Sequence, residues 1–235
     1  MTQNVGKKLV SIIISAYNEE KYLPDLIEDL KNQTYDKKNM YPKTSRIGNK
    51  MGDILITEKL DGSNLSIFKL NGELYIGQRN YIFRLDEIDE QKEMLYQGLH
   101  DWLKENGDFL EKELHEKAVI IGEWIGMGRI AYNWENKFFM FAKANVNEDF
   151  TLHKINYIHE YFIYSFVNRE IPSFISIVPL VKELNVYPTI AELDSLYEEY
   201  RAEENRNIEG FIVVESHGIK KYVRMKRGVL EPHHS

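Results

Sequence analysis

The sequence contains no cysteine among its 235 residues. It therefore has no disulfide framework and no thiolate metal site. It also lacks any apolar run near the roughly 20 residues that a membrane-spanning helix needs. The longest run, LVSIIISAY at 9–17, has the length of a buried strand. Its apolar centre, Val10–Ile14, is too short for the core of a signal peptide, and acidic residues follow it closely. We therefore expect a cytoplasmic protein without a membrane segment.

Basic residues are also in short supply, since 30 Lys and Arg stand against 37 Asp and Glu, for a net charge of −7. This balance argues against a protein that coats nucleic acid without specificity, because such binding depends on many contacts from Lys and Arg to phosphates. One stretch departs from the average: GIKKYVRMKRG, at 218–228, is rich in Lys and Arg and contains no acid. It is either the place where an anionic ligand binds or an edge strand decorated with cations.

The spacing of apolar residues predicts an α+β fold with largely antiparallel sheets. Strands are expected at 9–16, 53–60, 64–70, 75–83, 118–126, 137–146, 208–216 and 220–227, and helices at 24–33, 86–114 (broken near Asn106-Gly107), 152–167 and 190–201. The Asn71-Gly72 pair marks a hairpin turn.

A polar, turn-rich stretch at 34–52 is the expected linker. It separates an N-terminal extension, residues 1–40, from a main domain at 41–228. The remaining residues, 229–235, form a tail in which His233 and His234 resemble the remnant of an expression tag.

Lys59 raises the main functional question, because it ends an apolar run and is followed at once by Asp-Gly-Ser-Asn in KLDGSN, 59–64. It is either a surface lysine paired with the flanking Glu58 and Asp61, or a nucleophile. Gly62 would let the backbone come close to a ligand.

Further charged residues stand at the ends of other predicted strands. Glu123 ends the strand in GEWIG (122–126), and Glu209 opens the strand in IEGFIVV (208–214). Arg224 and Lys226, in VRMK (223–226), are two residues apart on a predicted strand and should share a face. Two acids and two bases around a lysine are typical of a phosphate-and-metal site.

As an ordered set, these four motifs resemble those of the covalent nucleotidyltransferases, which are DNA ligases, RNA ligases and mRNA capping enzymes. The ATP-dependent RNA ligases of the nick-sealing type are the most similar branch. Glu58 directly precedes the lysine, Asn64 lies five residues after it and Arg79 lies twenty after it. The resemblance spans about 41–228. It implies a nucleotidyltransferase (ATP-grasp-like) domain of antiparallel sheets flanked by helices, with the strand and helix of 1–40 as an extension.

The resemblance implies ATP and Mg²⁺, or Mn²⁺, as cofactors. The Lys59 amine would attack the α-phosphate of ATP, release pyrophosphate and form a lysyl–AMP bond. The AMP would pass to an RNA 5′-phosphate, and a 3′-hydroxyl would then displace it to join the strands. A lysine needs its free amine for such an attack. GTP-specific capping is the alternative within this class.

The same resemblance implies roles for the other residues. Glu58 would contact the adenine, and Asn64 would order metal-bound water near the α-phosphate. Arg79 and Glu123 would hold the ribose, and Glu209 would favour the metal.

The last motif and one aromatic complete the expected site. Lys226 would bind the α-phosphate, with Arg224 beside it, although the family usually has Lys-x-Lys here and Arg224 replaces the first lysine. Phe139 and Phe141, in KFFMF, share a face by alternation. We expect Phe141 to stack on the adenine. The chain stops soon after Lys226, where such ligases usually carry a further domain, so the resemblance supports lysine adenylylation more strongly than strand joining.

Two alternatives remain. Residues 10–36 resemble the opening strand and helix of family-2 glycosyltransferases, which implies sugar transfer from a nucleotide-sugar; however, the sequence contains no Asp-x-Asp metal motif. A noncatalytic nucleotide- or RNA-binding module would fit the acidic balance. The ligase-like interpretation accounts for the largest part of the sequence.

Overall fold

The structure is a computed structural model that describes residues 45–46, 51–215, 218–226 and 229–230. All of these residues belong to one compact unit, Lys38–Ser235. The strand and helix predicted at 9–16 and 24–33, and with them the whole N-terminal extension, lie outside the described residues.

The described elements confirm the α+β prediction. In chain order they are β1 (Ser45–Arg46), β2 (Met51–Lys59), β3 (Gly62–Leu70), β4 (Glu73–Gly77), β5 (Ile82–Arg84), the 3-10 helices η1 (Leu85–Glu87) and η2 (Lys92–Met94), α2 (Leu99–Glu113), β6 (Ala118–Ile125), β7 (Phe138–Val146), β8 (Leu152–Asn156), the 3-10 helix η3 (His159–Ser165), β9 (Ile175–Ile177), β10 (Leu180–Val186), α3 (Ile190–Glu204), β11 (Gly210–Glu215), β12 (Gly218–Val223), β13 (Met225–Lys226) and β14 (Val229–Leu230). Among the described residues, no helix is long and apolar enough to cross a membrane.

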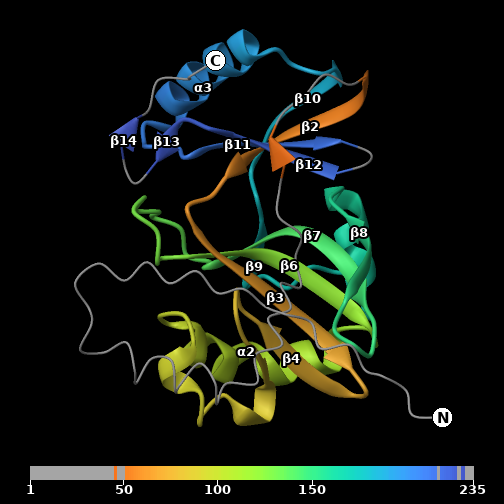
Figure 1. Cartoon of the computed structure of the whole chain (residues 1–235). Coiled ribbons are helices and arrows are strands. Elements are labelled where there is room, and N and C mark those ends of the chain that lie inside the picture. Colours follow the sequence, from red (N-terminus) through yellow and green to blue (C-terminus); the bar gives the residue numbers. More distant parts are fainter. Residues whose placement is uncertain (1–44, 47–50, 216–217, 227–228, 231–235) are drawn as a thin grey trace, which may run out of the picture. The chain divides into compact units, whose positions relative to one another are not determined.

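Five strands form the first sheet, in the order β1-β12-β11-β2-β10. All neighbours are antiparallel except β1 and β12. Helix α3 lies on this sheet (Figure 1), and its buried Leu193 and Tyr197 pack against Ile54, Phe211 and Tyr222. A capping box at the N-terminus of α3 fixes where the helix begins, because Thr189 and Glu192 exchange hydrogen bonds between side chain and backbone.

The second sheet has seven strands, in the order β5-β4-β3-β6-β7-β8, with β9 parallel to β7. Helix α2 covers one face of it with Leu99, Leu103 and Leu110, which join a core cluster with sheet residues such as Ile67 and Ile120. Side chains alternate along each strand, so Phe68, which follows Ile67, packs in a separate cluster on the other face. Both faces of this sheet are therefore apolar over much of their area.

The chain passes from one sheet to the other through two residues, Leu60 and Asp61. β2 ends at Lys59 in the five-stranded sheet, and β3 begins at Gly62 in the seven-stranded sheet (Figure 1). The lysine singled out by the sequence thus lies at the junction of the two sheets.

The helix prediction for 86–114 was wrong in part. Helix α2 begins only at Leu99, and it continues through Asn106-Gly107 without a break. Asn106 donates from Nδ2 to the Trp102 carbonyl, and a Cβ on Gly107 would lie 2.6 Å from Leu85 Cδ1. The glycine therefore allows helix α2 to pack closely against Leu85 of η1.

The predicted helix at 152–167 was wrong. Residues 152–156 form β8, which is antiparallel to β7, and 159–165 form the 3-10 helix η3. β8 covers an edge of β7 that would otherwise leave backbone groups unpaired, and this pairing overrides the helical spacing of the apolar side chains.

Candidate nucleotide-binding site

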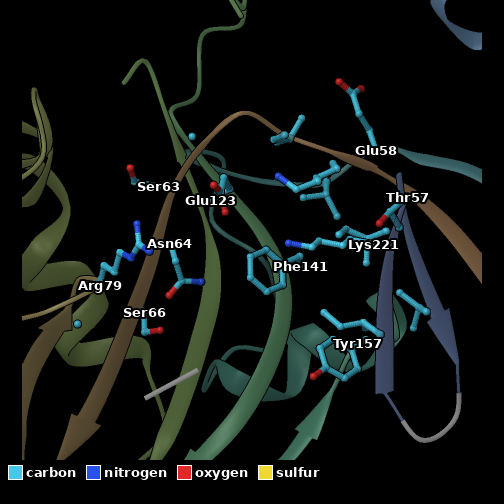
Figure 2. Close-up of a pocket in the computed structure, with 18 of the residues that line it drawn as sticks. Thr57, Glu58, Ser63, Asn64, Ser66, Arg79, Glu123, Phe141, Tyr157 and Lys221 are labelled. Atoms are coloured by element: carbon cyan, nitrogen blue, oxygen red, sulfur yellow. The ribbon is translucent and has the colours of Figure 1, made fainter. Parts of the chain in front are cut away.

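A cavity of about 690 Å³ is lined by residues of both sheets. Its size lies within the range of small-molecule sites in proteins. The predicted residues that line it are Glu58, Lys59, Asn64, Arg79, Glu123 and Phe141. Figure 2 shows Asn64, Glu123 and Phe141 on one side of this space and Lys221 on the other.

Lys59 enters the cavity paired with a glutamate from a distant part of the chain. Its Nζ lies 2.6 Å from Oε2 of Glu209, and both side chains are mostly buried. The pairing of Gly210 with Lys59, between β11 and β2, sets this contact. The flanking Asp61, which the sequence suggested as a partner, instead accepts hydrogen bonds at Oδ2 from the backbone N–H groups of Arg129 and Ile130, at 2.5 and 3.0 Å.

Glu123 lies beside this ion pair, on β6 opposite Asn64 of β3. The pKa of Glu123 is raised from 4.5 to about 7, above all by burial; Lys59 opposes this rise and the nearby Glu209 carboxylate adds to it. Burial also raises the pKa of Glu209, while Lys59 lowers it. The site thus holds two carboxylates that are hard to ionise together and one lysine that partly compensates them.

Gly62 explains how Glu123 and Asn64 come so close. A Cβ at Gly62 would lie 2.4 Å from the carbonyl oxygen of Trp124 and 2.9 Å from Cγ of Glu123. Only glycine allows β3 to approach β6 at this point. The glycine was expected to make room for a ligand; in this structure it makes room for the neighbouring strand.

Arg79 reaches the cavity from the loop after β4, and a tyrosine that the sequence analysis missed holds this loop. The hydroxyl of Tyr96 accepts a hydrogen bond from the Arg79 backbone N–H at 3.2 Å and donates to the Asn64 carbonyl at 3.0 Å. The Tyr96 N–H donates to Oε1 of Gln78 at 2.8 Å. Tyr96 comes from the segment before α2, so only the fold reveals its position.

Of the two candidate phenylalanines, Phe141 lines the cavity. Phe139 packs against Trp134, with ring centroids 4.8 Å apart, in a small cluster with Leu60 and Val178. The register of β6 against β7 shifts at this point, because Met140 pairs with Gly122 and Ala142 with Ile121. Phe141 lies at this irregularity, between Met140 and Ala142.

The backbone is irregular at the start of the last motif. The backbone N–H groups of Arg224 and Met225 both donate to the carbonyl of Glu209, each at 3.0 Å. Two residues thus stand opposite one, as in a β-bulge, so the backbone at Arg224 departs from that of a regular strand. The side chain of Lys226 lies outside the described residues.

Arg224 was expected beside the phosphate, but the structure places its guanidinium against α3. It lies 2.6 Å from Oδ1 of Asp194 and stacks on the ring of Tyr197 at 5.1 Å. The described cation that β12 contributes to the cavity is Lys221, opposite Ile212 of β11. The sequence distinguishes Lys221 only as one residue of the basic stretch at 218–228.

Glu58 was expected to contact a base, but in the structure its carboxylate binds Arg206 and Tyr200. The residue is 1% exposed, and Arg206 donates to both of its oxygens, at 2.6 and 2.5 Å. Tyr200 donates to Oε2 at 3.0 Å. In Figure 2 the carboxylate is directed away from Phe141 and Lys221.

The site is suited to a divalent cation only if the nucleotide contributes ligands. The described residues include no cluster of three His, Cys, Asp or Glu that could hold a metal ion. Glu209 and Glu123 supply two carboxylates. Mg²⁺ is commonly held by one or two carboxylates together with substrate phosphates and water, so this donor set fits it.

Comparison with known proteins supports the ligase-like interpretation at the level of the family. A model of the RNA ligase family matches residues 52–226, and a model of glycosyl transferase family 2 matches residues 11–41. A search of the curated proteins finds no match.

Several solved structures are similar in part. An archaeal ATP-dependent RNA ligase is 16% identical, with a TM-score of 0.48 over 78% of this chain and 48% of that one. A mutant RNA ligase of Naegleria gruberi with ATP and Mn is 14% identical, with a TM-score of 0.45 over 82% and 60%. A putative ATP-dependent DNA ligase from Aquifex aeolicus is 17% identical, with a TM-score of 0.45 over 85% and 62%. This chain therefore spans about half to three-fifths of the length of these proteins. Because the family model covers more than half of the chain, the chain belongs to the RNA ligase family.

Proposed function

We propose that the protein is an ATP-dependent RNA ligase that forms a covalent lysyl–AMP intermediate on Lys59. The proposal rests above all on one observation: Lys59 Nζ lies in a nucleotide-sized cavity, 2.6 Å from Glu209 and beside Glu123. Family membership supports the same chemistry.

Lys59 supplies the nucleophile. Its Nζ attacks the α-phosphorus of ATP, the new N–P bond forms, and the bond from that phosphorus to the pyrophosphate oxygen breaks. The lysine must first give up a proton, and Oε2 of Glu209 is the base in contact with it. The raised pKa of Glu209 makes it a better proton acceptor than an exposed glutamate.

The other lining residues bind and orient the nucleotide. Phe141 presents an aromatic face to the adenine, and Arg79 and Glu123 hold the ribose. Asn64, held opposite Glu123, lies near the α-phosphate. Lys226, and Lys221 from the wall across from Phe141, would neutralise phosphate charge.

A divalent cation, Mg²⁺ or Mn²⁺, would be held by Glu209 together with the triphosphate. When bound, it would supply positive charge that stabilises the transferred phosphoryl group and the leaving pyrophosphate. The same charge would oppose the repulsion between the two carboxylates.

After adenylylation, AMP would pass to the 5′-phosphate of an RNA strand, and a 3′-hydroxyl would displace it. An RNA acceptor is supported by the family to which the chain belongs.

Incubation with ATP labelled at the α-phosphate, in the presence of Mg²⁺, tests the proposal. We expect an acid-labile adduct in the wild type, none in Lys59→Ala, and an undiminished adduct in Lys220→Ala. Lys220 is a matched control because it carries the same charge on β12 but does not line the cavity. An unlabelled wild-type protein would show that this chain does not carry out the reaction.

A second candidate, sugar transfer, rests on the match of residues 11–41 to glycosyl transferase family 2. The two candidates separate on deletion of residues 1–40. Adenylylation should survive the deletion, because the described part of Lys59's cavity lies after residue 50. Sugar transfer from a nucleotide-sugar should not.

A further inference from the structure

The residue before the nucleophile is held by an unusually complete set of contacts. Glu58 is buried, both of its carboxylate oxygens accept from Arg206, and Oε2 also accepts from Tyr200. Two parallel hydrogen bonds between a guanidinium and a carboxylate fix orientation as well as distance. A carboxylate bound in this way has little capacity left for a ligand.

The Arg206 guanidinium is also packed against two aromatic rings. It lies 4.8 Å from the ring centre of Trp134 and 5.4 Å from that of Tyr132. The hydroxyl of Tyr132 in turn accepts the backbone N–H of Asp61 at 2.8 Å. Contacts that pass through Arg206 therefore hold the chain on both sides of Lys59, at Glu58 and at Asp61.

Arg206 also stands close in sequence to the partner of the nucleophile. It precedes Glu209 by three residues, on the segment between α3 and β11. The bond from Arg206 to Glu58 ties this segment to the end of β2, where Gly210 pairs with Lys59. One side chain thus links the strand that carries the nucleophile to the segment that carries Glu209.

We propose that Arg206 is a positioning residue for lysine adenylylation, acting through Glu58. It holds Lys59 and Glu209 in the alignment from which Nζ attacks the nucleotide, and Glu58 belongs to this clamp and does not read the base. This inference rests on the proposed function. Displacement of a reacting group by about 1 Å can cost about a hundred-fold in rate, so loss of the clamp should lower the rate of the chemical step.

The test compares Arg206→Lys, Glu58→Gln and the double variant in single-turnover adenylylation over a range of ATP concentrations. Lysine keeps the charge but loses the two parallel hydrogen bonds. We expect each single variant to lower the maximal rate by about ten-fold or more, with the KM for ATP within about two-fold of wild type. The double variant should be no slower than the slower single variant, because both changes break the same contact.

Two controls keep the result interpretable. Arg201→Lys changes a more exposed arginine of α3, which pairs with Glu198 and should leave the rate unchanged. Thermal unfolding followed by circular dichroism identifies any variant that is not folded at the assay temperature, and rates are compared only below its transition.

Several results would overturn the proposal. Normal rates in both single variants would show that the clamp has no positioning role. A raised KM for ATP, or an altered preference for ATP over GTP, in Glu58→Gln but not in Arg206→Lys would show that Glu58 reads the base. In each case adenylylation of the wild type stands. A wild type that acquires no adduct would instead remove the proposed function, and the positioning role with it.

Discussion

The two sheets contribute different chemistry to the cavity. The five-stranded sheet brings charge: Lys59 at the end of β2, Glu209 just before β11, and Lys221 on β12. The seven-stranded sheet brings Asn64, Phe141 and Glu123, whose carboxyl is largely uncharged below pH 7 because burial raises its pKa. Ionic contacts hold Lys59, the proposed nucleophile, while apolar packing supports the residues that we propose to face the nucleotide.

Because of this difference, substitutions in the two sheets should impair different steps of adenylylation. Changes around the end of β2 should mainly affect the rate of attack, because they move the nucleophile. Changes on the face of the seven-stranded sheet should mainly affect nucleotide binding, because they alter the surface against which the nucleotide rests. Gly62 is the exception, since it lies where the two sheets meet.

Gly62→Ala should have the largest effect. The added Cβ would meet the Trp124 carbonyl at 2.4 Å, so β3 and β6 must move apart and take Asn64 and Glu123 with them. We expect adenylylation to fall by about a hundred-fold or more and the free energy of unfolding to fall by about 1–3 kcal/mol. Single-turnover labelling and urea unfolding measure the two effects. Gly72→Asn is the control, because Gly72 has open space around it and a φ of +82° that asparagine tolerates. Equal rates for Gly62→Ala and wild type would contradict the close approach.

Glu123 should make the free energy of unfolding depend on pH, and this dependence should be weaker in Glu123→Gln. The folded protein keeps a proton on Glu123 up to about pH 7, whereas the unfolded chain loses it near 4.5. Stability from this group is therefore complete below pH 4.5 and declines as the pH rises to about 7, by up to about 3 kcal/mol. Urea unfolding at pH 5 and pH 8 should show a decline in the wild type that is smaller in Glu123→Gln. Identical declines in the two proteins would contradict the raised pKa.

Phe141→Leu should sharpen the division between binding and rate. Loss of an aromatic face against a base costs about 1–3 kcal/mol, so the KM for ATP should rise by about ten-fold with little change in the maximal rate of labelling. Phe139→Leu is the matched control, since Phe139 packs against Trp134 and should lower the unfolding temperature without changing the KM. A KM effect in Phe139→Leu alone would reverse the assignment of the two rings.

Arg224→Met should have the smallest effect on chemistry. Its guanidinium contacts Asp194 and Tyr197 of α3, and does not line the cavity. We expect a loss of about 1–2 kcal/mol in the free energy of unfolding, measured in urea, with adenylylation within about two-fold of wild type. A large loss of labelling in a folded Arg224→Met variant would show that this arginine acts on the phosphate.

The sequence was sufficient to predict the strands that end in charged residues. Apolar residues lead up to Lys59 and Glu123 and follow Glu209, and each of these segments forms a strand. Lys59 and Glu123 line the cavity, and Glu209 pairs with Lys59 at 2.6 Å. In these three segments the local pattern and the tertiary contacts favour the same structure. The roles assigned to these residues by resemblance remain proposals.

Features that depend on distant partners could not be predicted. Glu58 and Arg206 are 148 residues apart, and the sequence around each of them gives no sign of their contact. The bulge opposite Glu209 interrupts the regular pairing at Arg224 and Met225. Neither a long-range ion pair nor a bulge leaves a periodic signal in the sequence.

The prediction of a helix at 152–167 was wrong for a related reason. Its apolar spacing is compatible with a helix, but β7 offers an unpaired edge, and residues 152–156 pair with it. Backbone hydrogen bonding at a sheet edge outweighs a weak local preference. The position of Tyr96 beside Arg79 likewise follows from how the segment before α2 folds back on the sheet.

The mass of the intact protein after incubation with ATP and Mg²⁺ tests the central claim most directly. We predict that the wild type gains the mass of one adenylate and that peptide mapping places it on Lys59, while Lys59→Ala gains nothing. A wild-type mass that stays unchanged, or an adenylate on another residue that persists in Lys59→Ala, would contradict the assignment of Lys59 as the nucleophile.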